Sequence, residues 1–215
     1  MNIYSMKFKP IKAQARMSPR RYRLDRRAET TEETRRRIVQ ATQELHAQQG
    51  IYATSMTHIA ERAGVSVGTV YHHFPTYQDA VAACAQHTAE MLPLPTAQVF
   101  TGLSTLEDRV QRLARDIFGF YERLPEYERV RSERWGMPPI EAFVEREENN
   151  RLALTRDALR PFTVSARLVT ACAALLDVAV YAALTHAGMS SAKAAEEVSA
   201  FILARLEAAR RSSRA

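Results

Sequence analysis

The sequence predicts an all-α protein with two domains. Apolar residues recur at helical spacing through most of the chain, and no segment shows the strict alternation of a half-buried strand. Capping residues and prolines separate these segments, without a glycine-rich phosphate loop or a sequence repeat. With 215 residues, 46% of them hydrophobic and 25% charged, the chain can bury a core in one or two domains.

The first segment, residues 1–29, is predicted to form a flexible basic arm. Prolines and clustered arginines lie here without apolar periodicity. The opening residues also lack a long apolar run, so we expect no secretory leader. Thr30 and Glu33 then form a capping-box pattern, which predicts the start of a first helix that ends at Gly50.

Two short helices joined by a glycine turn are predicted between Ser55 and Phe74. Ser55 can cap the first of them, and Gly64 supplies the left-handed backbone position that ends it. Ser66 is a good N-cap for the second helix. Its Val70 and Phe74, at i and i+4, are expected to turn inward, which leaves small, hydroxyl and aromatic side chains outside. This outline is a helix-turn-helix, and its outer face suits the major groove of DNA.

Specific motifs run through this segment. The sequence Ile59-Ala60-Glu61-Arg62-Ala63-Gly64-Val65-Ser66 is followed by Gly68-Thr69-Val70-Tyr71, His73-Phe74 and Asp79-Ala80-Val81. These motifs resemble the DNA-binding domain of the TetR (tetracycline-repressor-like) family, and the resemblance covers about residues 34–81. It implies a homodimer that reads a palindromic operator with residues 30–81. It also implies a C-terminal domain, residues 82–215, that binds a small-molecule effector and dimerises through its last two helices.

Candidate DNA contacts follow from size and position. Ser55 and Thr57 begin the first motif helix and can donate to phosphate. On the second helix, Gly68 and Thr69 permit close approach to base edges, and Tyr71 can pack against a thymine methyl. The candidates are Ser55, Thr57, Ser66, Val67, Gly68, Thr69, Tyr71, His72, His73 and Tyr77.

Positive charge is concentrated in the first third of the chain. Residues 1–75 contain 13 lysines and arginines against 6 aspartates and glutamates, whereas residues 76–215 contain 17 against 18. This segregation is typical of a module that binds a polyanion, with a solvated tail as the alternative. Val67 and Tyr77 stand where the family often has lysine. Tyr77 would clamp a phosphate or pack locally, and His73 would contact phosphate or hold the turn.

The remainder of the chain is predicted to be helical. Helices are expected at about residues 77–91, 104–124, 126–134, 140–159, 165–186 and 190–211, the second of them opened by a capping box of Ser104 and Glu107. Prolines 138 and 139 are expected to interrupt the chain. The apolar segment 168–184 is long enough to suggest a membrane span, but Asp177 inside it favours a buried packing helix.

Aromatic and polarizable side chains in this part predict an effector pocket for an apolar or aromatic molecule. The candidates are Phe118, Tyr121, Trp135, Met137, Phe143, Asp177 and Tyr181. Trp135 stands out because it lies at a Gly-Met-Pro-Pro helix break, and the alternative for each aromatic residue is the core. The carboxylate of Asp177 can bind a ligand or pair with an arginine.

Catalysis, a metal and a cofactor are not expected. Glu145, Glu147 and Glu148 have the pattern of a solvated helix face, and no histidine pair or nucleophile motif accompanies them. Cys84 and Cys172 fit buried hydrophobes in a reducing cytosol. We therefore expect a cytoplasmic, ligand-responsive transcriptional repressor. The alternative is a DNA-binding architectural protein without a ligand.

Overall fold

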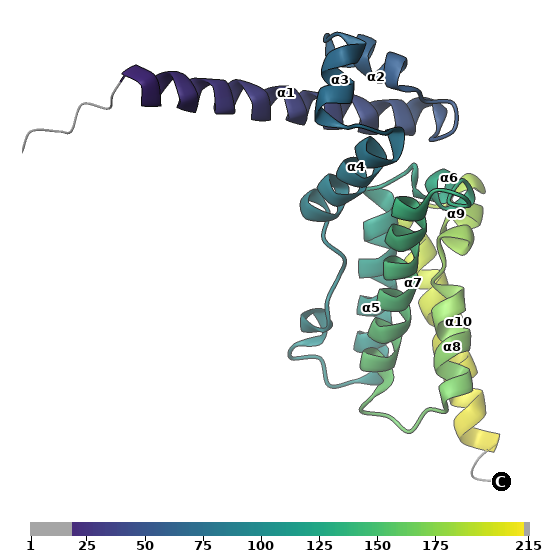
Figure 1. The fold of residues 1–215 in the computed structure, drawn as a ribbon. Coiled ribbons are helices and arrows are strands. Elements are labelled where there is room, and N and C mark those ends of the chain that lie inside the picture. Colours follow the sequence, from purple (N-terminus) through teal and green to yellow (C-terminus); the bar gives the residue numbers. More distant parts are fainter. Residues whose placement is uncertain (1–18, 213–215) are drawn as a thin grey trace, which may run out of the picture. The chain divides into compact units, whose positions relative to one another are not determined.

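Helices make up the regular structure of this chain. The computed structural model describes the backbone of residues 19–212 and the side chains of residues 29–211, and its elements within that range confirm the all-α class. In chain order (Figure 1) they are α1 (Pro19–Gln49), α2 (Met56–Ala63), α3 (Val67–His73), α4 (Tyr77–Met91), the 3₁₀ turn η1 (Ala97–Phe100), α5 (Leu106–Glu122), α6 (Tyr127–Ser132), α7 (Pro138–Leu159), α8 (Ala166–Leu175), α9 (Val178–His186) and α10 (Ser191–Ser212).

The chain divides into two compact units, residues 1–37 and residues 38–215. In the described part of the first unit the chain is helical from Pro19 onward, so the predicted helix start at Thr30 is wrong. Proline suits the first turn of a helix because an N–H there has no intrahelical partner, and arginine has good helix propensity. A lack of apolar periodicity therefore did not prevent a helix. The rest of the predicted arm, residues 1–18, lies outside the described residues.

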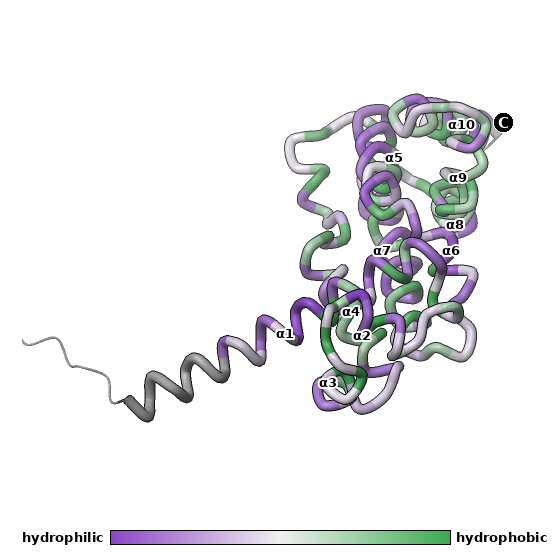
Figure 2. The backbone as a smooth tube through the Cα atoms, turned by 90° about the horizontal axis from the view of Figure 1, so that it is seen from above, coloured by the Kyte–Doolittle hydropathy of each residue, from purple (hydrophilic) through white to green (hydrophobic). Residues whose placement is uncertain are grey.

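The second unit contains two apolar cores. The smaller core is built by the end of α1, by α2 and α3, and by the start of α4, around Ile38, Ile59 and Val70. The larger core is built mainly by α5, α7, α8, α9 and α10, and α10 packs most extensively on α5. Hydrophilic and hydrophobic stretches alternate along α5 (Figure 2), as expected for a helix with one buried face.

Helix α4 contributes to both cores. Ala80 belongs to the smaller core, while Val81, the next residue, belongs to the larger one. Two cores are consistent with two domains, but they lie within a single compact unit. The predicted domain boundary at residue 81 therefore stays a prediction.

The apolar segment predicted as one helix at 165–186 is broken into α8 and α9. Asp177 causes the break, because its Oδ1 accepts a hydrogen bond from the N–H of Ala179 at 2.9 Å and caps α9. The segment Ala166–His186 is long and apolar enough to cross a membrane by length and composition alone. Its two helices have 10 and 9 residues, fewer than the about 20 that a spanning helix needs.

Two other helix starts differ from the sequence prediction. Helix α5 is capped by Thr105, whose Oγ1 accepts from the N–H of Asp108 at 3.0 Å, rather than by Ser104 one position earlier. Both patterns place an acidic residue three positions after a hydroxyl residue, so the sequence alone did not separate them. Pro138 and Pro139 do not interrupt the chain but form the first turn of α7, where proline is well tolerated.

Candidate nucleic-acid interface

Local hydrogen bonds build the helix-turn-helix as predicted. Ser55 Oγ accepts from the N–H of His58 at 3.2 Å and caps α2, and Ser66 Oγ accepts from the N–H of Thr69 at 3.1 Å and caps α3. Gly64 ends α2 at φ 64°, in the left-handed region that favours glycine. The turn between the helices is therefore specified within the motif itself.

The inner face of α3 fixes which of its side chains remain outside. Val70 is fully buried and Phe74 is 3% exposed in the smaller core, as expected. Tyr71 is consequently 50% exposed and Val67 36% exposed. Large apolar surface exposed on a short helix is typical of a binding face rather than of a core element.

The predicted DNA-contact residues lie mostly on this outer surface. The exposed candidates are Ser55, Thr57, Ser66, Val67, Gly68, Tyr71 and His72, while Thr69, His73 and Tyr77 are half-buried. The Thr69 hydroxyl is hydrogen-bonded to Ser66 Oγ at 2.8 Å. Gly68 has no positive φ, and a Cβ there would make only an ordinary contact with Ser66 Oγ at 3.8 Å, so neither the backbone nor the packing requires glycine there. Their contacts with DNA stay predictions.

The Tyr77 hydroxyl is hydrogen-bonded within the protein, which contradicts its predicted phosphate contact. It donates to the carbonyl of Ile51 at 2.5 Å and lies 2.9 Å from Nε2 of His46. Burial raises the pKa of Tyr77, so the hydroxyl remains a donor. The alternative of local packing is therefore correct, because a long side chain beside the α1–α2 loop finds acceptors inside the protein.

A buried histidine lies next to this tyrosine. Because the Tyr77 hydroxyl donates to Ile51, Nε2 of His46 carries the proton between them, and its Nδ1 faces Sγ of Cys84 at 3.9 Å. Burial lowers the pKa of His46 to about 4 and raises that of Cys84 to about 12. Cys172 is 1% exposed with a raised pKa for the same reason, so both thiols are buried as predicted.

Most residues predicted to line an effector pocket belong to the larger core. Phe118, Tyr121 and Met137 are buried there. The Tyr181 ring is half-buried and lies 5.2 Å from that of Phe118 between centroids. These side chains contact one another rather than an open space, and Phe143 alone among the candidates lines a described hollow. Contact of these residues with an effector stays a prediction.

Trp135 is exposed rather than in a pocket. Its side chain is 67% exposed, and its ring stacks on the guanidinium of Arg134 at 4.1 Å. Gly136 follows at φ 76°, so the chain reverses there and leaves the indole outside. The helix break was therefore predicted correctly, but the direction of the side chain was not.

Asp177 pairs with arginines inside the domain. Its Oδ2 lies 2.9 Å from Arg151 and 3.2 Å from Arg131. Arg151 also binds Glu147, which is 4% exposed and accepts from the hydroxyls of Tyr121 at 2.7 Å and Tyr127 at 3.0 Å. Glu147 is therefore a buried ion-pair residue, and its assignment to a solvated face was wrong.

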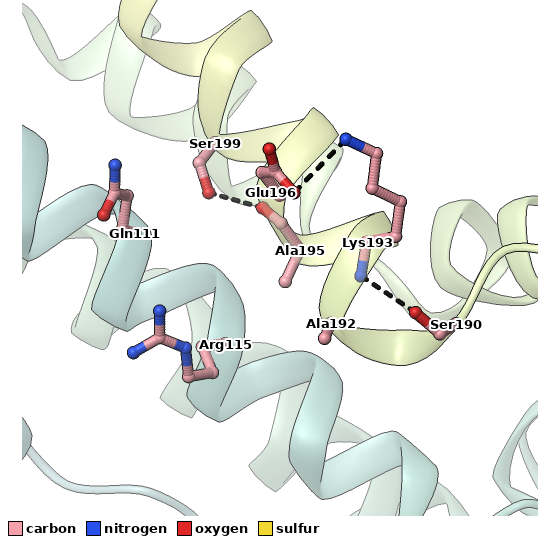
Figure 3. Close-up of a pocket in the computed structure, with 8 residues that line it drawn as sticks. All are labelled: Gln111, Arg115, Ser190, Ala192, Lys193, Ala195, Glu196 and Ser199. Carbon is pink, nitrogen blue, oxygen red and sulfur yellow. Dashed lines mark hydrogen bonds and ion pairs between the residues drawn. The ribbon is translucent and has the colours of Figure 1, made fainter.

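Among the hollows in the described part of the chain, two of the larger ones lie against the helices of the larger core. One, of about 490 Å³, lies between α4 and α7 and is lined by Ala82, Ala85, Gln86, Ala89, Glu90, Pro139, Ala142, Phe143 and Arg146. The other, of about 580 Å³, lies between α5 and α10, where Gln111 and Arg115 face the start of α10 (Figure 3). Its remaining lining is polar or small: Ser190, Ala192, Lys193, Ala195, Glu196 and Ser199. The described residues contain no cluster suited to a metal ion.

Known proteins resemble this chain in sequence and fold. Residues 38–84 match the family described as bacterial regulatory proteins, tetR family. The chain is 40% identical over 67 residues to the HTH-type transcriptional regulator SrpR of Pseudomonas putida, which is 30% of this chain and 32% of that regulator. The match thus spans about a third of the relative's length.

Two solved structures share the fold over most of the chain. A tetR-family transcriptional regulator from Streptomyces coelicolor has a TM-score of 0.62 at 20% identity, covering 80% of each chain. The regulator FadR from Bacillus subtilis, in complex with stearoyl-CoA, has a TM-score of 0.59 at 13% identity and covers 77% of this chain and 96% of its own. At these identities the likeness shows a common fold alone.

Proposed function

Because this chain belongs to the TetR family of bacterial regulatory proteins, we propose that it is a DNA-binding transcriptional regulator that responds to a small molecule in the cytoplasm. The observation that carries the proposal is the outer face of α3. The side-chain cap from Ser66 and the buried Val70 hold this helix, and Tyr71 and Val67 are exposed on it. The positive charge in the first third of the chain supports attraction to phosphate.

A homodimer follows from the need to read both halves of a palindrome. Two recognition helices must lie about 34 to 36 Å apart to enter successive major grooves on one side of DNA. The last helices carry exposed apolar side chains that fit a subunit interface, with Leu175 37% exposed and Phe201 68% exposed. Exposed alanines at positions 171, 174, 179 and 183 would permit close helix approach.

The hollow between α4 and α7 is the proposed effector site. Its volume of about 490 Å³ suits a small molecule, and its alanine, proline and phenylalanine side chains favour an apolar or aromatic one. Helix α4 directly follows the recognition helix, so a ligand that separates α4 from α7 would favour a state with lower operator affinity. The protein would then act as a repressor that its effector releases.

One glycine tests the DNA-binding proposal. Gly68→Ala should leave the fold intact and raise stability by up to about 1 kcal/mol, because alanine favours the helix. The added methyl should nevertheless weaken binding to a DNA duplex that the wild type selects from a random pool. Gly119→Ala is the control, since that glycine is also helical and has open space around it. If both variants bound this duplex with the affinity of the wild type, α3 would not be part of the DNA interface.

A further inference from the structure

The last turn of α1 is held by an arginine from a distant part of the chain. The guanidinium of Arg129, on α6, donates to the carbonyls of His46 at 3.2 Å and Gln48 at 3.4 Å, and also to that of Ala47. Carbonyls at a helix C-terminus lack intrahelical partners, and positive charge is favourable there. Arg129 therefore acts as a C-terminal cap for α1.

The loop that follows α1 is held by a carboxylate from the same segment. Glu133 Oε2 accepts from the N–H of Ile51 at 2.5 Å and from that of Tyr52 at 3.4 Å. Gly50 precedes them at φ 91°, and a Cβ there would overlap the Glu133 carboxylate. Glycine at this position therefore permits both the turn and the approach of the carboxylate.

Three further contacts hold the loop after α1. The Tyr52 hydroxyl donates to the carbonyl of Trp135. The Ile51 side chain is fully buried in the larger core, although it belongs to the loop that leads into α2. The Ile51 carbonyl accepts from Tyr77, the first residue of α4. Residues 46–52 are thus bound both to the segment 129–135 and to the helix that follows α3.

We propose that Arg129 and Glu133 are positioning residues for DNA binding, and we refer to their contacts with residues 46–52 as the α1 clamp. The clamp fixes the helix-turn-helix to the effector domain, so that both copies of α3 in the dimer keep the orientation that DNA requires. Without the clamp, the orientation of α3 that can bind DNA becomes one of several. The affinity for DNA then falls in proportion to the fraction of molecules in that orientation. This inference rests on the proposed function.

The Arg129 guanidinium concentrates its contacts on the end of α1. Nε of Arg129 is buried without a hydrogen-bond partner. Such a group costs free energy, and buried groups of this kind are uncommon in native structures. The same guanidinium nevertheless contacts the carbonyls of three successive residues.

The clamp is tested by Glu133→Ala and Arg129→Ala in the full chain. The matched controls are Glu128→Ala, an exposed carboxylate on α6, and Arg123→Ala, an exposed arginine at the end of α5. Amide hydrogen exchange should show that Ile51 loses protection in Glu133→Ala but not in the controls. Affinity for the duplex selected by the wild type should fall about tenfold in both clamp variants, which corresponds to about 1.4 kcal/mol.

A conservative variant separates positioning from general destabilisation. Glu133→Gln keeps an acceptor oxygen for the Ile51 N–H, so it should restore most of the protection and affinity lost in Glu133→Ala. Unchanged protection of Ile51 in Glu133→Ala would refute the contact. Lost protection with unchanged DNA affinity, in protein that remains folded, would refute the positioning role. If the wild type selects no duplex, the proposed function fails, while exchange at Ile51 still confirms or refutes the contact.

Discussion

Replacing Glu147 by alanine should destabilise the larger core strongly. Its carboxylate is 4% exposed and receives hydrogen bonds from the Tyr121 and Tyr127 hydroxyls and from Arg151. Loss of one partner of a buried ion pair costs about 3 to 5 kcal/mol. We expect the lower end, about 3 kcal/mol, because Arg151 keeps Asp177 at 2.9 Å and the Ala173 carbonyl at 2.8 Å.

The measurement is urea unfolding followed by circular dichroism, at fixed protein concentration because a dimer's stability depends on it. Glu145→Ala is the control: it lies on the same helix, is exposed, and gains the same helix propensity. It should change stability by no more than about 0.5 kcal/mol. Glu147→Gln keeps one acceptor oxygen, so its loss in the free energy of unfolding should lie between those of Glu147→Ala and Glu145→Ala. If Glu147→Ala lost no more stability than Glu145→Ala, the buried network would not contribute as argued.

Two further predictions concern the loop after α1 and its surroundings. The pKa of His46 is about 4 in the folded protein and about 6.5 when unfolded, so the unfolded state binds more protons between these values. The contribution of His46 to the free energy of unfolding should be fully present above pH 6.5. It should fall by about 3 kcal/mol as the pH approaches 4. Unfolding of His46→Gln at pH 7 and pH 4.5 should lack this dependence, and an equal dependence in both proteins would contradict it. Gly50→Ala should cost more than Gly188→Ala in thermal unfolding. Both glycines have φ near 90°, at 91° and 93°, but only Gly50 has Glu133 against it. The excess should disappear in a Glu133→Ala background, and its persistence there would exclude the carboxylate as its cause.

Local sequence patterns predicted the helix-turn-helix well. Ser55 and Ser66 bind N–H groups three residues away, and Gly64 needs only its own backbone conformation. Such signals are complete within a few residues of sequence. The inward direction of Val70 followed from helical spacing in the same way.

The part of the chain that follows α4 was predicted less well, because its important contacts are distant in sequence. Glu133 and Ile51 are 82 residues apart, and the α1 clamp left no local signal. Glu147 lies within a run of charges, and its burial depends on which face of α7 meets Tyr121 and Tyr127. The outward direction of Trp135 likewise depends on how the chain turns at a residue beyond the helix.

The two buried cysteines make this protein convenient for labelling. Both thiols are shielded and have raised pKa values, so they react slowly with maleimides at neutral pH. A cysteine introduced in place of the exposed Glu61 on α2 would therefore react with a spin label much faster than the two native cysteines. In the proposed dimer, pulsed electron paramagnetic resonance would measure the distance between the two labels. That distance reports the separation of the two helix-turn-helix units directly. Adding candidate effectors to the labelled protein would show whether that separation changes, without requiring the operator to be known.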